Sequence, residues 1–176
     1  KDEGEEGDCD EELKGTIISA LFKCAVSQEN CENLLVHILQ QLLPLVCFPY
    51  EARECHMLLL DLMHQAHPRL LGGSSGNNLS SLFAIVAQLS GLFLEARSII
   101  SSSDTTGGLS VLDADDADFW NEQLVPEEFG DKVRGLFTSE EAGSGAICGF
   151  DKGSVLSVIG SLPEEYQQAL SALLEQ

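Results

Sequence analysis

The chain has 176 residues, enough for one domain with a sizeable core, and its hydrophobic content of 44% is that of a folded rather than a disordered protein. Its net charge of −20, from 29 acidic and nine basic residues, argues against nucleic acid and anionic membranes as direct partners and favours a basic protein partner. Aromatic residues are few and Leu, Ala, Val and Ile dominate, which favours helices packed on helices.

The N-terminal part combines an acidic segment with an amphipathic pattern. Residues 1–10 are acidic and contain glycine, so we expect a linker or loop there. Helical spacing of apolar residues predicts a helix over residues 11–27, followed by a polar turn and by Asn33 as the cap of the next helix. The face that we expect this first helix to bury consists of Leu13, Ile17, Ala20, Leu21 and Cys24.

Two apolar helices joined at a proline-bounded corner dominate the middle of the chain. They are predicted over residues 33–43 and 51–66, because Pro44 cannot continue the first helix and Pro49 suits the first turn of the second. Ordering such a pair opposes most of what its burial contributes, so we expect further helices beside it. The apolar faces are Leu34, Leu35, Ile38, Leu39, Leu42 and Leu43 in the first helix, and Ala52, Cys55, Leu59, Leu62, Met63 and Ala66 in the second.

The second half of the chain is again helical in pattern. We predict a long core helix over residues 78–100, a helix over 126–138, a short helix capped by Asp151 and a last helix opened by Pro163. The most apolar run, residues 82–94, is shorter than the roughly 20 residues that a bilayer requires, so we expect no membrane insertion.

Loops rich in glycine, serine and acidic residues separate these helices, at residues 101–122 and 139–149. No strand-like alternation of apolar and polar residues competes with the helical pattern. Helix, turn and helix recur roughly every 35–50 residues, which is the period of helical solenoids. The sequence therefore predicts an all-α fold, with residues 11–176 forming repeated helical hairpins.

Sequence motifs of catalysis or metal binding are missing. His64 and His67 could share one helical face, but they lack the spacing of a zinc motif, and the six cysteines contain no CxxC pair. The glycines that start at Gly72 lack the ending of a phosphate-binding loop, and a nucleophile elbow does not occur. We expect no enzyme activity, no catalytic residue, no cofactor, no metal and reduced cysteines in an intracellular protein.

An acidic cluster with two aromatic residues lies in a stretch that contains no Lys or Arg between Ser98 and Asp131. Its aspartates lack the spacing, the glycine and the final glutamate of a calcium loop. The cluster is either a solvated tether or a contact for basic cargo, and its tryptophan either covers a helix end or anchors a partner. The candidate cargo contacts are Asp113, Asp115, Asp116, Asp118, Phe119, Trp120 and Glu122.

Three passages resemble the C-terminal end of importin-beta (karyopherin-beta) nuclear transport receptors. Residues 34–45, ending Leu-Leu-Pro-Leu, resemble the A helix and Leu-Pro corner of that family, and residues 51–67 with Pro68 resemble the following B helix. Residues 155–170, Val-Leu-Ser-Val-Ile-Gly-Ser-Leu-Pro-Glu-Glu-Tyr-Gln-Gln-Ala-Leu, resemble its closing helices. The passages cover less than half of the chain, and the closest likeness is to the branch that imports histones and ribosomal proteins.

The resemblance implies a HEAT-repeat solenoid of armadillo type that carries basic cargo proteins through the nuclear pore. It implies that this chain is the C-terminal part of a receptor of the cytoplasm and nucleus, and that Ran GTPase and nucleoporins bind through repeats outside it. Such receptors have no catalytic residues and work by the shape and charge of their surfaces. The alternative is a HEAT-repeat scaffold or adaptor subunit of another intracellular assembly.

Overall fold

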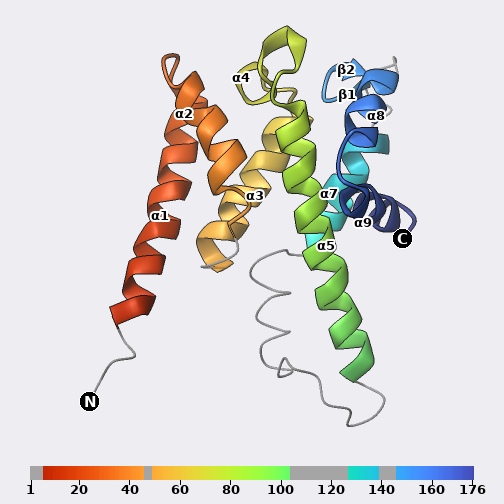
Figure 1. Cartoon of the computed structure of the whole chain (residues 1–176), viewed down its shortest axis with the longest axis horizontal. Coiled ribbons are helices and arrows are strands. Elements are labelled where there is room, and N and C mark those ends of the chain that lie inside the picture. Colours follow the sequence, from red (N-terminus) through yellow and green to blue (C-terminus); the bar gives the residue numbers. More distant parts are fainter. Residues whose placement is uncertain (1–5, 46–48, 104–126, 139–145) are drawn as a thin grey trace.

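A computed structural model describes residues 6–45, 49–103, 127–138 and 146–176, which are mostly helical (Figure 1). The prediction of an all-α protein is thus confirmed at the level of class. One short β-hairpin departs from it, with β1 (Ala146–Ile147) antiparallel to β2 (Phe150–Asp151). Cys148 and Gly149 between them both have positive φ, 51° and 79°, which suits a two-residue hairpin turn. The end of the loop expected at 139–149 therefore belongs to the hairpin.

Helix α1 (Glu6–Ser27) differs from its prediction in its start and in its buried face. Residues 6–10, expected in a linker, are helical. The buried side chains are Ile18, Phe22, Ala25 and Val26, whereas the whole predicted face is exposed, with Leu13 at 59%, Ile17 at 47% and Leu21 at 37%. The physical reason is that α1 is apolar on two opposite sides, so that periodicity alone could not decide which side meets the core.

The proline-bounded corner forms where the sequence predicts it. Helix α2 (Glu32–His37) continues as the π-helix η1 (Ile38–Leu42), and Leu43 before Pro44 is extended. Helix α3 (Pro49–His64) starts at its proline. The backbone N–H of Leu45 donates to Nε2 of the buried His56 at 3.1 Å, which ties the corner to α3.

The N-cap residue of α2 was predicted wrongly. Asn33 does not cap α2, because the helix already includes Glu32 and the N-cap position is held by Cys31, which makes no side-chain cap. The predicted apolar faces are otherwise confirmed, since most of their side chains are buried and the rest are half-buried.

A compact turn connects α3 to the core helix. Ala66, at φ 49°, lies just beyond the end of α3, and α4 (Pro68–Leu71) and the 3₁₀ turn η2 (Gly73–Ser75) follow. Gly72 between them has φ 82°, and a Cβ there would lie 2.8 Å from the backbone N of Asn77. Only glycine fits this position without strain.

Helix α5 (Leu79–Ser103) is the core helix. Its stretch Leu79–Ser98 has 20 residues with a mean hydropathy of 1.6, long and apolar enough by length and composition to cross a membrane, and 56% of the hydropathy window is buried inside the protein. This apolar stretch is therefore longer than the run of residues 82–94 that the sequence analysis considered. Its fully buried side chains include Leu82, Phe83 and Val86, as in the core helix of a folded domain.

The last helices complete the core. They are α7 (Glu127–Thr138), α8 (Lys152–Gly160) and α9 (Glu164–Leu174). Asp151 caps α8 as predicted, because its carboxylate accepts from the backbone N of Ser154 at 3.0 Å. Pro163 precedes the first turn of α9.

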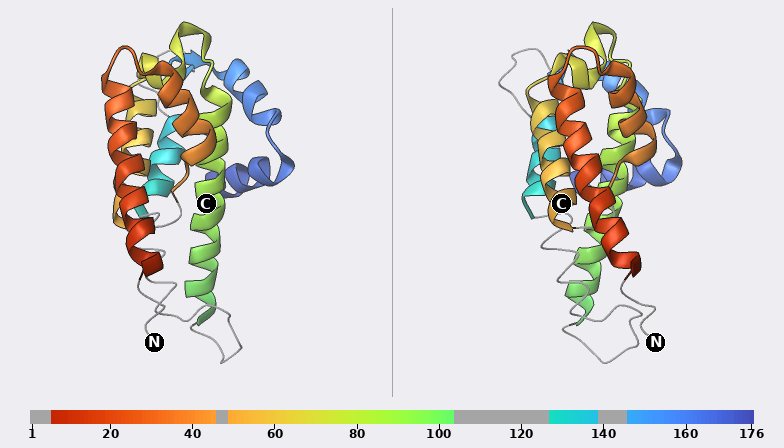
Figure 2. Two further views of the ribbon diagram at one scale, coloured as in Figure 1. Left: turned by 60° about the vertical axis from the view of Figure 1, so that its left-hand side comes forward. Right: turned by 90° about the vertical axis from the view of Figure 1, so that its left-hand side faces the viewer.

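The helices pack as two rows. One row consists of α1, α3 and α7 in contact, and the other of η1, α5 and α9. Contacts of α1 with η1, and of α7 with both α5 and α9, join the two rows. The left view of Figure 2 looks along the rows and shows α1, α3 and α7 on one side and α5 and α9 on the other. Helix α9 lies across α5 rather than alongside it.

Candidate functional site

The acidic cluster that the sequence singles out lies outside the described residues. The candidate contacts Asp113, Asp115, Asp116, Asp118, Phe119, Trp120 and Glu122 all belong to the stretch 104–126. Their role as cargo contacts therefore stays a prediction.

Four basic side chains of the described surface form ion pairs. Lys23 lies 2.8 Å from Glu54 and Arg134 lies 2.7 Å from Asp131. Arg69 pairs with Glu29 at 3.3 Å, and Lys132 of α7 pairs with Asp61 of α3. Other carboxylates, those of Glu32, Glu95 and Glu165 among them, form no ion pair with a described residue.

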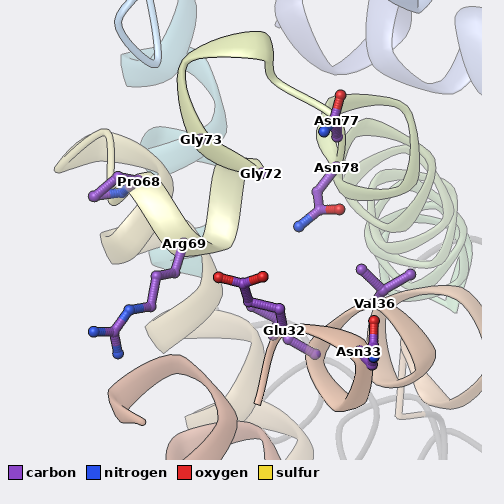
Figure 3. A pocket seen from close by; sticks show the side chains of 10 residues that line it. Glu32, Asn33, Val36, Pro68, Arg69, Gly72, Gly73, Asn77 and Asn78 are labelled. Atoms are coloured by element: carbon purple, nitrogen blue, oxygen red, sulfur yellow. The ribbon is translucent and has the colours of Figure 1, made fainter. Parts of the chain in front are cut away.

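A pocket of about 400 Å³ lies between the start of α2, the helix α4 and the turn before α5 (Figure 3). The Glu32 carboxylate points into it from below, and the Asn78 side chain reaches down from the start of α5 (Figure 3). Asn78 is only 7% exposed, and its side-chain amide donates to the carbonyl of Leu70 at 2.9 Å. This bond and the tight Gly72 turn make one wall of the pocket well defined.

The electrostatics of this pocket are mixed. Arg69 lines it, but its guanidinium donates to the carbonyl of Val26 at 3.3 Å and pairs with Glu29, which directs its charged end away from the pocket centre (Figure 3). The Glu32 carboxylate forms no ion pair within the described residues. With Arg69 paired and directed away, Glu32 is the charged side chain that points inward, and one exposed carboxylate does not by itself define a ligand site.

A second hollow of about 390 Å³ lies where α9 crosses α5, beside the corner at Pro44. We call it the α5–α9 groove. Several of its lining residues are small or apolar, and the charged side chains among its described lining residues are all acidic. The residues that line it are Pro44, Ala87, Gln88, Gly91, Leu92, Glu95, Glu165, Tyr166 and Ala169.

The described histidines take part in local backbone contacts. Nε2 of His64 donates to the backbone carbonyl of Lys132 at 2.8 Å, and His67 occupies the N-cap position of α4. Within the described residues, no group of three His, Cys, Asp or Glu side chains could hold a metal ion.

The described cysteines are free thiols: Cys24, Cys31, Cys55 and Cys148. Burial raises the pKa of Cys55 from 9.0 to about 12, although Lys23 lowers it slightly, and burial alone raises the pKa of Cys148 to about 12. Such buried neutral thiols behave as small hydrophobic groups rather than as nucleophiles. The expectation of free thiols at Cys9 and Cys47 stays a prediction.

The α5–α9 groove was not found by sequence reasoning. Glu95 and Glu165 lie far apart in the chain, and the sequence alone does not reveal that α9 crosses α5. The small residues Gly91 and Ala169 are the one signal that could have suggested a close approach of two helices there.

Comparison of the chain with protein-family models, with curated proteins and with solved structures finds no match.

Proposed function

We propose that this chain is part of the HEAT-repeat solenoid of an importin-beta-type nuclear transport receptor and that it binds basic protein cargo of histone or ribosomal-protein type. Ran GTPase and nucleoporins would engage repeats outside this chain. The proposal extends the sequence resemblance of the Leu-Pro corner and of the closing helices, and it assigns to the chain a role in binding rather than in catalysis.

The two-sided apolar character of α1 carries the proposal. Phe22 and Ala25 face the core, while Leu13, Ile17 and Leu21 face outward from the end of the row that α1 forms with α3 and α7. A helix that is apolar on opposite sides is typical of the interior of a stack, where a neighbour covers each side. The arrangement in two rows supports the same reading, because stacked helical hairpins produce one row from their first helices and one from their second.

Charge supports the choice of a basic partner. The chain carries a net charge of −20, and four of its basic side chains, Lys23, Arg69, Lys132 and Arg134, are paired with carboxylates within the molecule. A surface of one sign attracts a partner of opposite sign and speeds its encounter, an effect that salt screens. Lys-rich tails are therefore the partners that this surface favours.

The test is depletion of the protein in the cells that make it. The nuclear-to-cytoplasmic ratio of fluorescent histone and ribosomal-protein reporters should fall, while a reporter with an unrelated import signal should keep its ratio. Reintroducing the protein should restore the ratio. A HEAT scaffold of another assembly, the alternative, would leave every reporter unchanged, and that result would refute the proposed transport function.

A further inference from the structure

We propose that the α5–α9 groove is a docking site for a protein segment in which an apolar side chain is flanked by lysine or arginine residues. The inference deepens the proposed function, because it names a surface and the side-chain pattern that a basic partner would present to it. It is argued without the acidic cluster in residues 104–126, since every groove residue that it uses is a described one.

The floor of the groove is apolar because small residues keep two helices close without filling the space between them. A Cβ placed on Gly91 of α5 would lie 3.9 Å from the Cβ of Ala169 of α9, which is ordinary van der Waals contact. Leu92 and Tyr166 are half-buried, and they line the groove together with Pro44. The volume of about 390 Å³ accommodates a large aliphatic side chain and its neighbours.

The rim of the groove supplies the charge complementarity. Glu95 and Glu165 are both exposed, and neither forms an ion pair within the described residues. They come from different helices, and among the described residues no basic side chain lines the groove. An apolar segment alone would leave these carboxylates beside an uncharged ligand, whereas flanking lysine or arginine residues would pair with them.

The experiment measures fluorescence anisotropy of a labelled synthetic peptide, Lys-Lys-Leu-Lys-Lys, titrated with the protein at low salt. Ala169→Leu fills the groove and should weaken binding at least about tenfold, as loss of a central anchor does. The matched control is Ala172→Leu, the same change at an exposed position of α9 outside the groove, which should bind like the parent.

A second pair of variants tests the charges. Glu95→Gln combined with Glu165→Gln should weaken binding by about threefold to tenfold, and the difference should vanish in about 1 M salt, where the screening length is about 3 Å. Glu128→Gln combined with Glu175→Gln changes the net charge equally at exposed positions away from the groove and should have little effect. The peptide with alanine in place of leucine should bind the parent more weakly.

Equal affinity of the Ala169→Leu and Ala172→Leu proteins for the peptide would overturn the docking site. Loss of self-association in the Ala169→Leu protein, with unchanged peptide binding, would assign the groove to a second copy of this chain and would also overturn it. These outcomes leave the proposed transport function standing. Conversely, groove binding that persists while depletion leaves nuclear import unchanged would refute the transport function alone.

Discussion

Burial differs sharply among the leucines of this chain, and the difference sets their contributions to stability. Leu39 and Leu59 are 2% and 0% exposed and belong to the apolar faces of the corner, whereas Leu13 of α1 is 59% exposed. Truncating a buried leucine removes transfer free energy and leaves a cavity, while truncating an exposed one does neither. Burial rather than hydrophobicity alone should therefore decide the cost.

Leu39→Ala and Leu59→Ala should each lower the free energy of unfolding by about 2–5 kcal/mol. In the 176-residue chain by itself, Leu13→Ala on the exposed side of α1 should lower it by less than about 0.5 kcal/mol. Equilibrium urea unfolding measures all three. A loss at Leu13 as large as that at Leu59 would mean that the outer side of α1 is covered in the protein as it exists in solution.

Thiol reactivity should follow burial at the same scale. Cys24 is exposed, which corrects the expectation that its face of α1 is buried, and it should react quickly with iodoacetamide near pH 8 in the native protein. Cys55 and Cys148 should react only after denaturation, because their pKa values of about 12 keep them protonated and their burial blocks access. Mass spectrometry of alkylated peptides checks this order, and rapid native alkylation of Cys55 would contradict its burial.

At the scale of elements, several helix boundaries were predictable because residues at the boundary itself decide them. Pro44, Pro49 and Asp151 each act through their own backbone geometry or side chain, and each boundary was confirmed. The orientation of α1 was not predictable, because two opposite sides of that helix are equally suited to a core. The short hairpin escaped prediction since two-residue strands are too short for a period to show.

The cap of α8 can be tested on its own. Asp151→Ala removes the acceptor of the Ser154 N–H and should lower the free energy of unfolding by about 0.5–2 kcal/mol. Asp151→Asn retains a side-chain oxygen at the same place and should cost much less. Urea unfolding of both variants provides the measurement, and an equal loss in the two would show that the charge of Asp151, rather than its capping bond, stabilises this region.

At the scale of the whole molecule, the net charge could be predicted from the sequence, but the residues that come together on one surface could not. The net charge of −20 follows from composition, but only the crossing of α5 and α9 brings Glu95 and Glu165 to one groove. The two-row packing likewise depends on contacts between α3 and α7, and between α5 and α9, that are distant in the chain. Such contacts depend on how side chains of distant segments pack together, and the local patterns of a single sequence do not reveal this packing.

The acidic cluster between α5 and α7 can be tested as a separate surface. Replacing Asp113, Asp115, Asp116 and Asp118 by asparagine should weaken binding of a histone-tail peptide by about threefold or more at low salt and reduce the salt dependence of binding. Fluorescence anisotropy at two salt concentrations measures both quantities. Affinity and salt dependence equal to those of the parent would identify the cluster as a tether without a partner.

The most direct test of the central claim is a titration of the unmodified protein with a Lys-rich histone-tail peptide and with the same peptide acetylated at every lysine. Acetylation removes the positive charge and keeps the length and most of the shape of the side chain. Binding of the basic peptide should weaken steeply as salt rises, and binding of the acetylated peptide should be at least about tenfold weaker at low salt. Equal affinity for the two peptides, or no binding of either, would contradict the account of this chain as a binder of basic cargo.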